Sequence, residues 1–179
     1  MADMRRSGLA YCEGDAIRPS GRSRLDVEKY AAHVAEIAKF DPRDDGDLSK
    51  LQKSFGGRIH VVNMDDLIDA RTGAIYVHGK FDFDIQIPDY TSPLRDRFTV
   101  AHEFGHYFLH ARQGKTPIIA FRRGSGRVEW EANWFAAALL MPSKEFAAAL
   151  KKTQDISKIA NSFGVSTDAA EIRRKALSL

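Results

Sequence analysis

The sequence predicts an α+β protein in which a small antiparallel or mixed sheet of about three strands packs on a helical core. Apolar residues recur with helical spacing over residues 24–40, 97–110 and 128–142. Residues 58–87 instead contain stretches in which apolar and polar residues alternate, which is typical of strands. The chain has 179 residues, of which 44% are hydrophobic, so it can bury one core and has little room for two.

The chain divides into an arm and one domain. Residues 1–23 are rich in Gly, Arg, Ser and Asp, and we expect them to form a flexible N-terminal arm. Residues 24–179 form a single domain with N-terminal helices in 24–57, the sheet and the main helices in 58–142, and a helical pair in 143–179.

Two helices are expected at the start of the domain. Residues 24–40 carry apolar side chains at helical spacing, and Asp41-Pro42 ends the run. A shorter helix is predicted over residues 48–55, because Gly56-Gly57 supply the left-handed conformations that a helix exit needs.

Three strands are expected next, at residues 58–64, 74–78 and 81–87, with a loop at 69–73. The third strand alternates apolar and polar residues throughout, so one of its faces is buried. At the edge of the sheet this strand would hold an extended peptide by main-chain hydrogen bonds. An ordinary strand inside the sheet fits the same pattern.

The segment at residues 97–110 predicts a helix with a metal site. His102 and His106 lie about 40° apart on one helical face, where two imidazoles can bind one ion. With Glu103 they form the pattern His-Glu-x-x-His, in which the histidines bind Zn²⁺ and the glutamate is a general base toward water. The alternative is two ordinary histidines on an apolar helix, which would then need other polar partners.

A catalytic Zn²⁺ needs a third protein ligand, and no histidine follows His110. The helix expected at residues 128–142 opens with Glu129 and Glu131, which lie about 200° apart and cannot both face the metal. The face that carries Glu131 is apolar, so we expect it to pack on the histidine helix; it includes Trp134, Phe135 and Ala138. Glu131 is therefore the favoured ligand, and Glu129 is the alternative. If Glu129 does not bind the metal, it could form an ion pair or contact one of the metal ligands.

Other residues are expected around the cleft. His110 follows His102 by eight residues, which places it about 80° away on a continuous helix and makes it a poor third histidine ligand. We keep His110 and Tyr107 as candidates that line the cleft or stabilise a transition state. Residues 113–127 contain Gly, Pro and Arg, and predict a loop that covers the cleft or is simply solvated.

Charge and cysteine content narrow the function classes. The net charge is only +3, and the 27 basic residues are interspersed with 24 acidic ones, so nucleic-acid binding is permitted but not indicated. The single cysteine, Cys12, excludes an internal disulfide and a cysteine-based zinc site. No signal-peptide pattern and no stretch of about 18 apolar residues occurs. We expect a soluble cytoplasmic protein without a membrane partner.

The C-terminal segment at residues 155–177 predicts two helices around a tight turn, with Ser166 as the N-cap of the second. This pattern is typical of a DNA-binding helix-turn-helix, in which Arg173, Arg174 and Lys175 would contact phosphates. A structural helical pair is the alternative.

Two separated motifs, RFTVAHEFGH at residues 97–106 and EWEANWFA at 129–136, followed by LLMP at 139–142, resemble the ImmA/IrrE family of metallopeptidases. The resemblance covers roughly residues 58–177. It implies a gluzincin-like core of the zincin type, in which Glu103 is the general base. The zinc ligands that it implies are His102, His106 and Glu131. It also implies that the C-terminal helices are structural, which argues against direct DNA binding.

The resemblance implies a protein substrate as well. Members of the family cleave helix-turn-helix repressors or toxin-antitoxin partners, often of phage or other mobile-element origin, and so release transcription. The leading hypothesis is a zinc-dependent endopeptidase that controls gene expression in this way. The alternatives are a metal-containing regulator that docks a repressor or toxin without proteolysis, and a DNA-binding regulator that uses the C-terminal helices.

Overall fold

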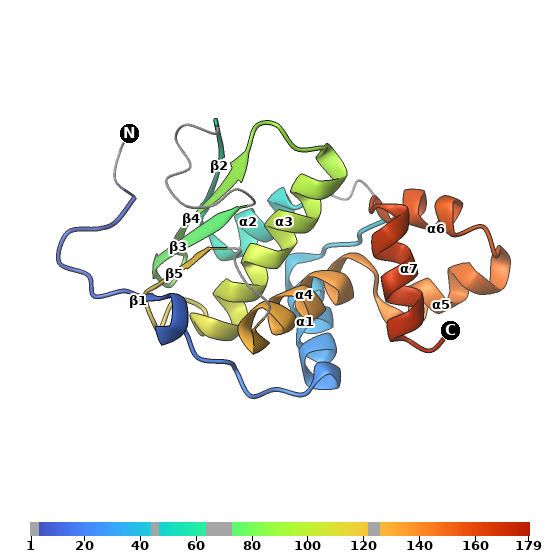
Figure 1. The fold of residues 1–179 in the computed structure, drawn as a ribbon, viewed down its shortest axis with the longest axis horizontal. Coiled ribbons are helices and arrows are strands. Elements are labelled where there is room, and N and C mark those ends of the chain that lie inside the picture. The colour runs from blue at the N-terminus through green and yellow to red at the C-terminus, as the bar shows by residue number, and fades with distance from the viewer. Residues whose placement is uncertain (1–3, 44–46, 64–72, 122–125) are drawn as a thin grey trace.

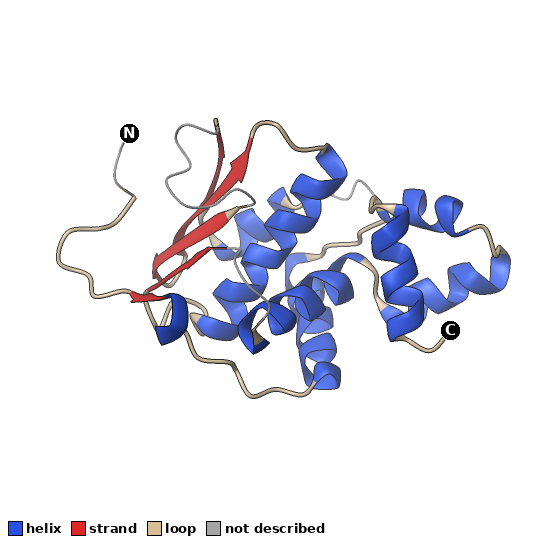
Figure 2. Ribbon diagram, in the orientation of Figure 1, coloured by secondary structure: helices blue, strands red, loops and turns tan. Residues whose placement is uncertain are grey.

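The computed structural model describes residues 4–43, 47–63, 73–121 and 126–179, and it confirms the α+β class. A sheet lies on one side, and helices fill the centre and the opposite end (Figures 1 and 2). The helices are α1 (Arg24–Ala38), α2 (Ser49–Phe55), α3 (Pro93–Gly105), α4 (Arg127–Leu140), α5 (Ser143–Lys152), α6 (Ile156–Phe163) and α7 (Thr167–Ala176). The strands are β1 (Cys12–Glu13), β2 (Arg58–Val62), β3 (Ala74–Gly79), β4 (Asp82–Pro88) and β5 (Ile118–Phe121).

The sheet is mixed and has five strands in the described residues, two more than the sequence predicts. Their order is β1-β5-β3-β4-β2. Strand β3 pairs antiparallel with both β4 and β5. At the two edges, β2 pairs parallel with β4, and β1 pairs parallel with β5. The additional strands are β1, in the expected N-terminal arm, and β5, in the expected loop at residues 113–127. Both are too short for a periodic pattern, because they have only two and four residues.

Strand β4 lies inside the sheet, where Ile85 is opposite Ile75 on one side and Ile59 on the other. The idea that this strand forms a free edge for a peptide is therefore wrong. Its alternating pattern is correct in another respect, because Phe83, Ile85 and Ile87 are all buried. The expected strand end at Met64 and most of the expected loop at 69–73 fall outside the described residues.

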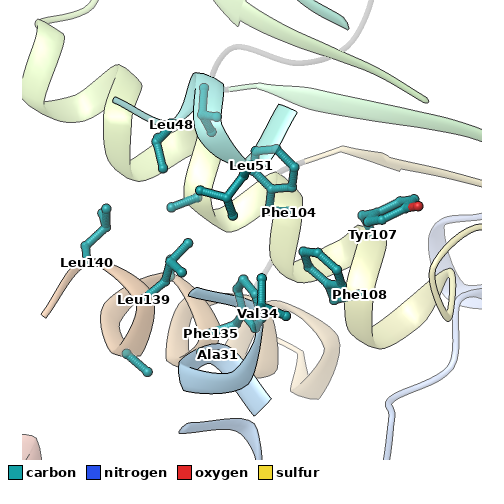
Figure 3. Packing of buried hydrophobic residues seen from close by; sticks show 14 of the residues in the cluster. Ala31, Val34, Leu48, Leu51, Phe104, Tyr107, Phe108, Phe135, Leu139 and Leu140 are labelled. Carbon is teal, nitrogen blue, oxygen red and sulfur yellow. The ribbon is translucent and has the colours of Figure 1, made fainter. Parts of the chain in front are cut away.

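Helix α3 is the centre of the molecule, with the sheet on one side and α4 and α1 on the other (Figure 1). It begins at Ser92-Pro93, where the Ser92 hydroxyl accepts the Arg95 N–H and proline fits the first helical turn. Phe104 contacts Phe83 of the sheet edge-on. On the other side Phe108 stacks on Phe135 of α4, beside Val34 of α1 (Figure 3).

The expected single helix over residues 97–110 changes its winding after Gly105. His106–His110 form a π-helical turn, η3, in which the Ala111 N–H donates to the His106 carbonyl at 2.9 Å. Such wide turns inside α-helices occur frequently at functional sites. Gly105 itself is where α3 and α4 meet, because a Cβ at this position would lie 2.9 Å from Ala132 Cα.

The C-terminal part holds three helices, α5 to α7, rather than a pair. Ser166 caps α7 as predicted, because its hydroxyl accepts the Ala169 N–H at 3.2 Å. Arg173 does not face solvent: it is 2% exposed, pairs with Glu28 of α1 at 2.7 Å and donates to the Met141 carbonyl at 2.9 Å. The guanidinium group of Arg173 is therefore bonded inside the protein, whereas a DNA-binding helix would direct it toward a phosphate group.

The outer face of the sheet carries a polar cluster. Asp84 is 6% exposed and lies within 2.9 Å of nitrogen atoms of Arg58, His60 and His78. The Tyr11 hydroxyl lies 2.8 Å from His78 Nδ1, so the N-terminal segment reaches this face. Burial raises the pKa of Asp84, but its bonds to Arg58 and to the two histidines have the larger, opposite effect and hold the pKa well below the usual range.

The described helices are all too short or too polar to cross a bilayer.

Candidate metal centre

The two histidines of the His-Glu-x-x-His pattern lie together on the face of α3 and η3 that meets α4. The rings of His102 and His106 have centroids 4.9 Å apart, and their Nε2 atoms are 3.1 Å apart. Both residues are fully buried. The helical spacing of four residues therefore brings two imidazole nitrogens to one point, as the sequence predicts.

Glu129 of α4 supplies a carboxylate at the same point. Its Oε2 lies 3.2 Å from His102 Nε2, and its Oε1 lies 3.4 Å from His106 Nε2. Ligand atoms of these three residues all lie within 4.8 Å of one another.

The separations fit a tetrahedral metal site. With metal–ligand bonds of about 2.0–2.1 Å, neighbouring ligand atoms of a tetrahedron are about 3.3–3.4 Å apart, close to the distances found here. Two imidazoles and one carboxylate are also a ligand set that a catalytic zinc uses. The residues present therefore fit a divalent metal ion.

The structure places Glu129, and not the favoured Glu131, beside the histidine pair. The reason is the face of α4 that packs on α3. Apolarity predicts the side with Trp134 for that contact, but the close approach at Gly105 is made by the small residue Ala132, on the side of Glu129. The face of α4 that packs on α3 is the one that allows the two backbones to approach closely. The apolar character of its side chains does not determine it alone.

Glu131 lies on the far side of the histidines and is fully buried. Its Oε2 accepts the Ser20 N–H at 2.7 Å and lies 3.3 Å from His110 Nε2. Its Oε1 accepts from Arg127 Nε at 3.0 Å. Glu131 therefore interacts with His110 and with the N-terminal segment.

His110 lies next to His106, at the end of the turn η3. On a continuous α-helix it would be about 80° from His102 and about 40° from His106; in η3 its Nδ1 lies 3.1 Å from Nδ1 of His106. His110 thus contacts the back of a histidine of the site, and it is not in the group of ligand atoms around Glu129.

Burial and hydrogen bonds set the charges around the pair. Burial raises the pKa of Glu129, but bonds to His102 and His106 lower it more, to about 2. Burial and the neighbouring His106 lower the pKa of His110 to about 4, against the opposing effect of Glu131. Burial also raises the pKa of Glu131, but its bonds from Ser20 and Arg127 lower it overall. At neutral pH Glu129 and Glu131 are thus ionised and His110 is neutral.

Asn133 orients His102, and sequence reasoning missed it. Its Oδ1 lies 3.0 Å from His102 Nδ1, where it can accept a hydrogen bond from that nitrogen; a ring protonated on Nδ1 leaves the Nε2 lone pair for a metal ion. The signal was present in the sequence, because Asn133 is one helical turn after Glu129 and shares its face.

Glu103 is fully buried on α3, next to His102 in the chain. The first described residue before β3, Gly73, packs against it: a Cβ on Gly73 would lie 3.3 Å from Glu103 Oε1 and 2.5 Å from the Thr99 methyl. Only glycine fits the close approach of this backbone, which also has φ +132°.

Tyr107 lies away from the centre. It is fully buried under the sheet, contacts Phe83, and its hydroxyl accepts the Phe81 N–H at 3.2 Å (Figure 3). Burial raises the pKa of the phenol. The structure thus gives Tyr107 a place in the core, and it does not support the expected contact to a transition state.

A cavity of about 670 Å³ reaches Glu129 from the surface. Its walls are the turn after β1, the end of β5 and the first turn of α4; they include Glu13, Asp15, Phe121 and Arg127. A larger cavity of about 920 Å³ lies between α1 and the C-terminal helices, and neither His102 nor His106 lines it. The smaller one is the cleft of interest because a candidate metal ligand lines it. Arg122 and Arg123 of the predicted covering loop fall outside the described residues.

Comparisons with known proteins identify related sequences and a similar fold. The chain is 36% identical over 63 residues to the metallopeptidase ImmA of Bacillus subtilis (strain 168), a match that covers 35% of this chain and only 37% of that protein. A transcriptional regulator of Mycobacterium tuberculosis has a similar fold, with a TM-score of 0.53 at 20% identity, over 82% of this chain and 45% of the regulator. A likeness at that identity shows the fold alone.

A model of the IrrE N-terminal-like domain, which represents the M78 peptidases, matches residues 66–175. This range is more than half of the chain and includes both histidines, Glu103 and both acids of α4. The family implies a divalent metal, and the three converging side chains are a suitable place for it. The chain therefore belongs to the ImmA/IrrE family of metallopeptidases.

Proposed function

We propose that this protein is a zinc-dependent endopeptidase that cleaves a protein substrate, and that His102, His106 and Glu129 hold the zinc ion. The observation that carries the proposal is the convergence of these three buried or nearly buried side chains, at 3.1–3.4 Å, beside a cleft that Glu129 lines. Membership of a metallopeptidase family supports it.

When bound, the metal ion supplies a Lewis acid that polarises a peptide carbonyl and makes a water molecule more acidic. The side chains do the remaining work. Asn133 keeps the His102 proton on Nδ1, and Glu129 neutralises part of the cationic charge, because it is ionised at neutral pH.

Glu103 is the proposed general base. Its carboxylate takes a proton from the attacking water while the water oxygen forms a bond to the carbonyl carbon. The same carboxyl then gives that proton to the leaving amine as the C–N bond breaks. Its burial on α3 favours this work, since interactions with charged groups are stronger where water is excluded.

We propose a helix-turn-helix repressor or a toxin-antitoxin partner as the substrate, cleaved in the cytoplasm to release transcription. The family resemblance of the two motifs supports this class. The packing of Arg173 against Glu28 argues against the alternative of a DNA-binding regulator, because that arginine is held inside the protein.

The experiment is co-expression with the repressor or antitoxin encoded by the neighbouring gene, followed by intact-mass analysis of both proteins. We expect cleavage at one site with the natural sequence and none with Glu103→Gln, although the variant keeps its zinc. Glu36→Gln is the control, because it makes the same chemical change on a carboxylate whose side chain is 83% exposed.

Cleavage that survives Glu103→Gln would remove the general base from this account. A stoichiometric complex without cleavage by the natural sequence would instead favour the second candidate, a regulator that docks its partner without proteolysis.

A further inference from the structure

Behind the candidate ligand His106 lies a chain of buried polar groups that the proposed reaction does not use. His106 Nδ1 is 3.1 Å from His110 Nδ1, and His110 Nε2 is 3.3 Å from Glu131 Oε2. The side chains of His110 and Glu131 are both fully buried. The three residues therefore form a linear path that starts at the metal centre and leads away from the cleft.

Only one arrangement of protons satisfies every contact in this path. A ligand nitrogen must be unprotonated, so His106 binds through Nε2 and carries its proton on Nδ1. That proton is donated to His110 Nδ1, which must accept it. His110 then carries its own proton on Nε2 and donates it to Glu131 Oε2.

Glu131 is held from outside this path. Its Oε2 accepts the Ser20 N–H at 2.7 Å, and its Oε1 accepts from Arg127 Nε at 3.0 Å. Arg127 in turn donates to the Arg22 carbonyl at 2.7 Å. The carboxylate is thus fixed by the N-terminal segment and by its own helix, so it offers a rigid acceptor to His110.

We propose that His110 and Glu131 are positioning residues for the metal centre, which fix His106 in the tautomer and the ring orientation that leave its Nε2 free for a metal ion. The inference rests on the proposed metal centre but needs no proteolysis. His102 has the corresponding support in Asn133, so each histidine of the pair is oriented by one neighbour. His106 and His110 are the first and last residues of the π-helical turn η3.

The test measures zinc affinity by competition with a chromophoric chelator, using the metal ion alone. His110→Leu removes the acceptor, and we expect a zinc dissociation constant about 10–100 times larger. His110→Asn places an amide oxygen near the position of Nδ1, and we expect an affinity within about threefold of the natural protein. Glu131→Leu should resemble His110→Leu.

His78→Leu is the matched control. It removes another buried histidine, on the outer face of the sheet, and tests whether loss of stability alone weakens zinc binding. We expect its zinc affinity to stay within about threefold of the natural value, even if its melting temperature falls. Equal weakening by His78→Leu and His110→Leu would overturn the proposal.

A second measurement does not depend on any variant. Long-range ¹H–¹⁵N correlation spectra of the zinc-loaded natural protein report the tautomer of each histidine, and we expect the Nδ1–H form for His106 and the Nε2–H form for His110. The opposite form at His110 would overturn the proposal even if His110→Leu does not fold. If the natural protein binds no zinc at all, the proposed function fails; if it binds zinc and His110→Leu binds equally well, only this inference fails.

Discussion

Two glutamates of α4 separated by a single residue have different partners in this protein. Glu129 faces the histidine pair, and Glu131 faces His110 and Ser20. Because α-helical residues two apart point about 200° away from each other, one helix turn serves both the front and the back of the same centre. The centre is thus built from α3, η3 and α4 together.

Asn133 gives a prediction at the scale of one residue. Asn133→Leu keeps a similar volume but removes the acceptor that lies 3.0 Å from His102 Nδ1. We expect zinc affinity to fall by about 10–100-fold, because residues that orient a ligating histidine typically matter to this extent. Chelator competition measures the change, and Asn161→Leu on the exposed side of α6 is the control. An unchanged affinity would show that His102 does not need this partner.

The pair of histidines could be predicted from the sequence, because their geometry depends only on the local rise and rotation of one helix. The positions of the two acids of α4 relative to the pair could not be predicted in the same way. Whether Glu129 or Glu131 meets the pair depends on which side of α4 approaches α3, and that depends on the contact between Gly105 and Ala132. The π-helical turn, which moves His110, has no signal in the spacing of apolar residues.

At the scale of elements, the crossing of α3 and α4 controls the centre. A Cβ at Gly105 would lie 2.9 Å from Ala132 Cα and 3.1 Å from its carbonyl oxygen, both of which are backbone atoms. The two helices must therefore separate if any side chain is present at residue 105.

Gly105→Ala tests this crossing. We expect the free energy of unfolding to fall by about 1–3 kcal/mol, as for other overpacked interiors. We also expect zinc affinity to fall at least about tenfold, because Glu129 moves away from the histidines with α4. Denaturant titration and chelator competition measure the two effects. Gly79→Ala is the control, because a Cβ there meets nothing within 4 Å; equal effects of the two substitutions would contradict this account.

The sheet gives a prediction about pH. The side chain of Asp84 is 8% exposed and ion-paired with Arg58, and its bonds to Arg58 and two histidines hold its pKa well below the usual value of an aspartate. A carboxyl whose pKa is lowered by folding stabilises the protein above its unfolded pKa and loses this contribution as pH falls toward its folded pKa. We expect Asp84→Asn to cost about 3 kcal/mol at pH 7, and the difference to shrink below about pH 4.

Urea titrations of both proteins between pH 7 and pH 2 measure this difference. Asp82→Asn is the control, because its side chain is 38% exposed and its pairs with Arg6 and Arg58 are expected to contribute less than about 1 kcal/mol. A difference for Asp84→Asn that stays constant to pH 2 would contradict the lowered pKa.

Helices and strands were predicted well where a regular pattern of apolar residues extends over many positions. The ranges of α1, α4 and β4 follow the alternation or helical spacing of their apolar residues. Strands β1 and β5 were missed because a pair of two to four residues is stabilised by its neighbours in the sheet, and that information is not local. The interior position of β4 likewise depends on pairing with β2 and β3, which its own sequence does not specify.

At the scale of the whole molecule, Arg173 ties the C-terminal helices to α1. Its guanidinium makes two contacts with the Glu28 carboxylate, at 2.7 and 3.3 Å, and its side chain is 2% exposed. The same guanidinium donates to the Met141 carbonyl at the end of α4. One side chain therefore joins α7, α1 and α4, and α4 carries Glu129.

Arg173→Met should leave the mostly buried Glu28 with only the partly exposed Arg24 as its cation, and we expect the free energy of unfolding to fall by about 3 kcal/mol. Arg174→Met is the matched control; its pair with Glu171 is about one third exposed on each side, and we expect a loss below about 1 kcal/mol. Chemical denaturation measures both. Similar losses of unfolding free energy from the two substitutions would contradict the expectation that the buried Arg173–Glu28 pair stabilises the protein more than the exposed pair does.

The central claim is that His102, His106 and Glu129 bind one zinc ion. Anomalous diffraction at the zinc edge from crystals of the zinc-loaded protein tests it most directly. We expect a single strong peak about 2 Å from Nε2 of both histidines and from a carboxylate oxygen of Glu129, with Glu131 still bonded to His110. A peak coordinated by Glu131 instead of Glu129, or the absence of a peak at the histidine pair, would contradict the account.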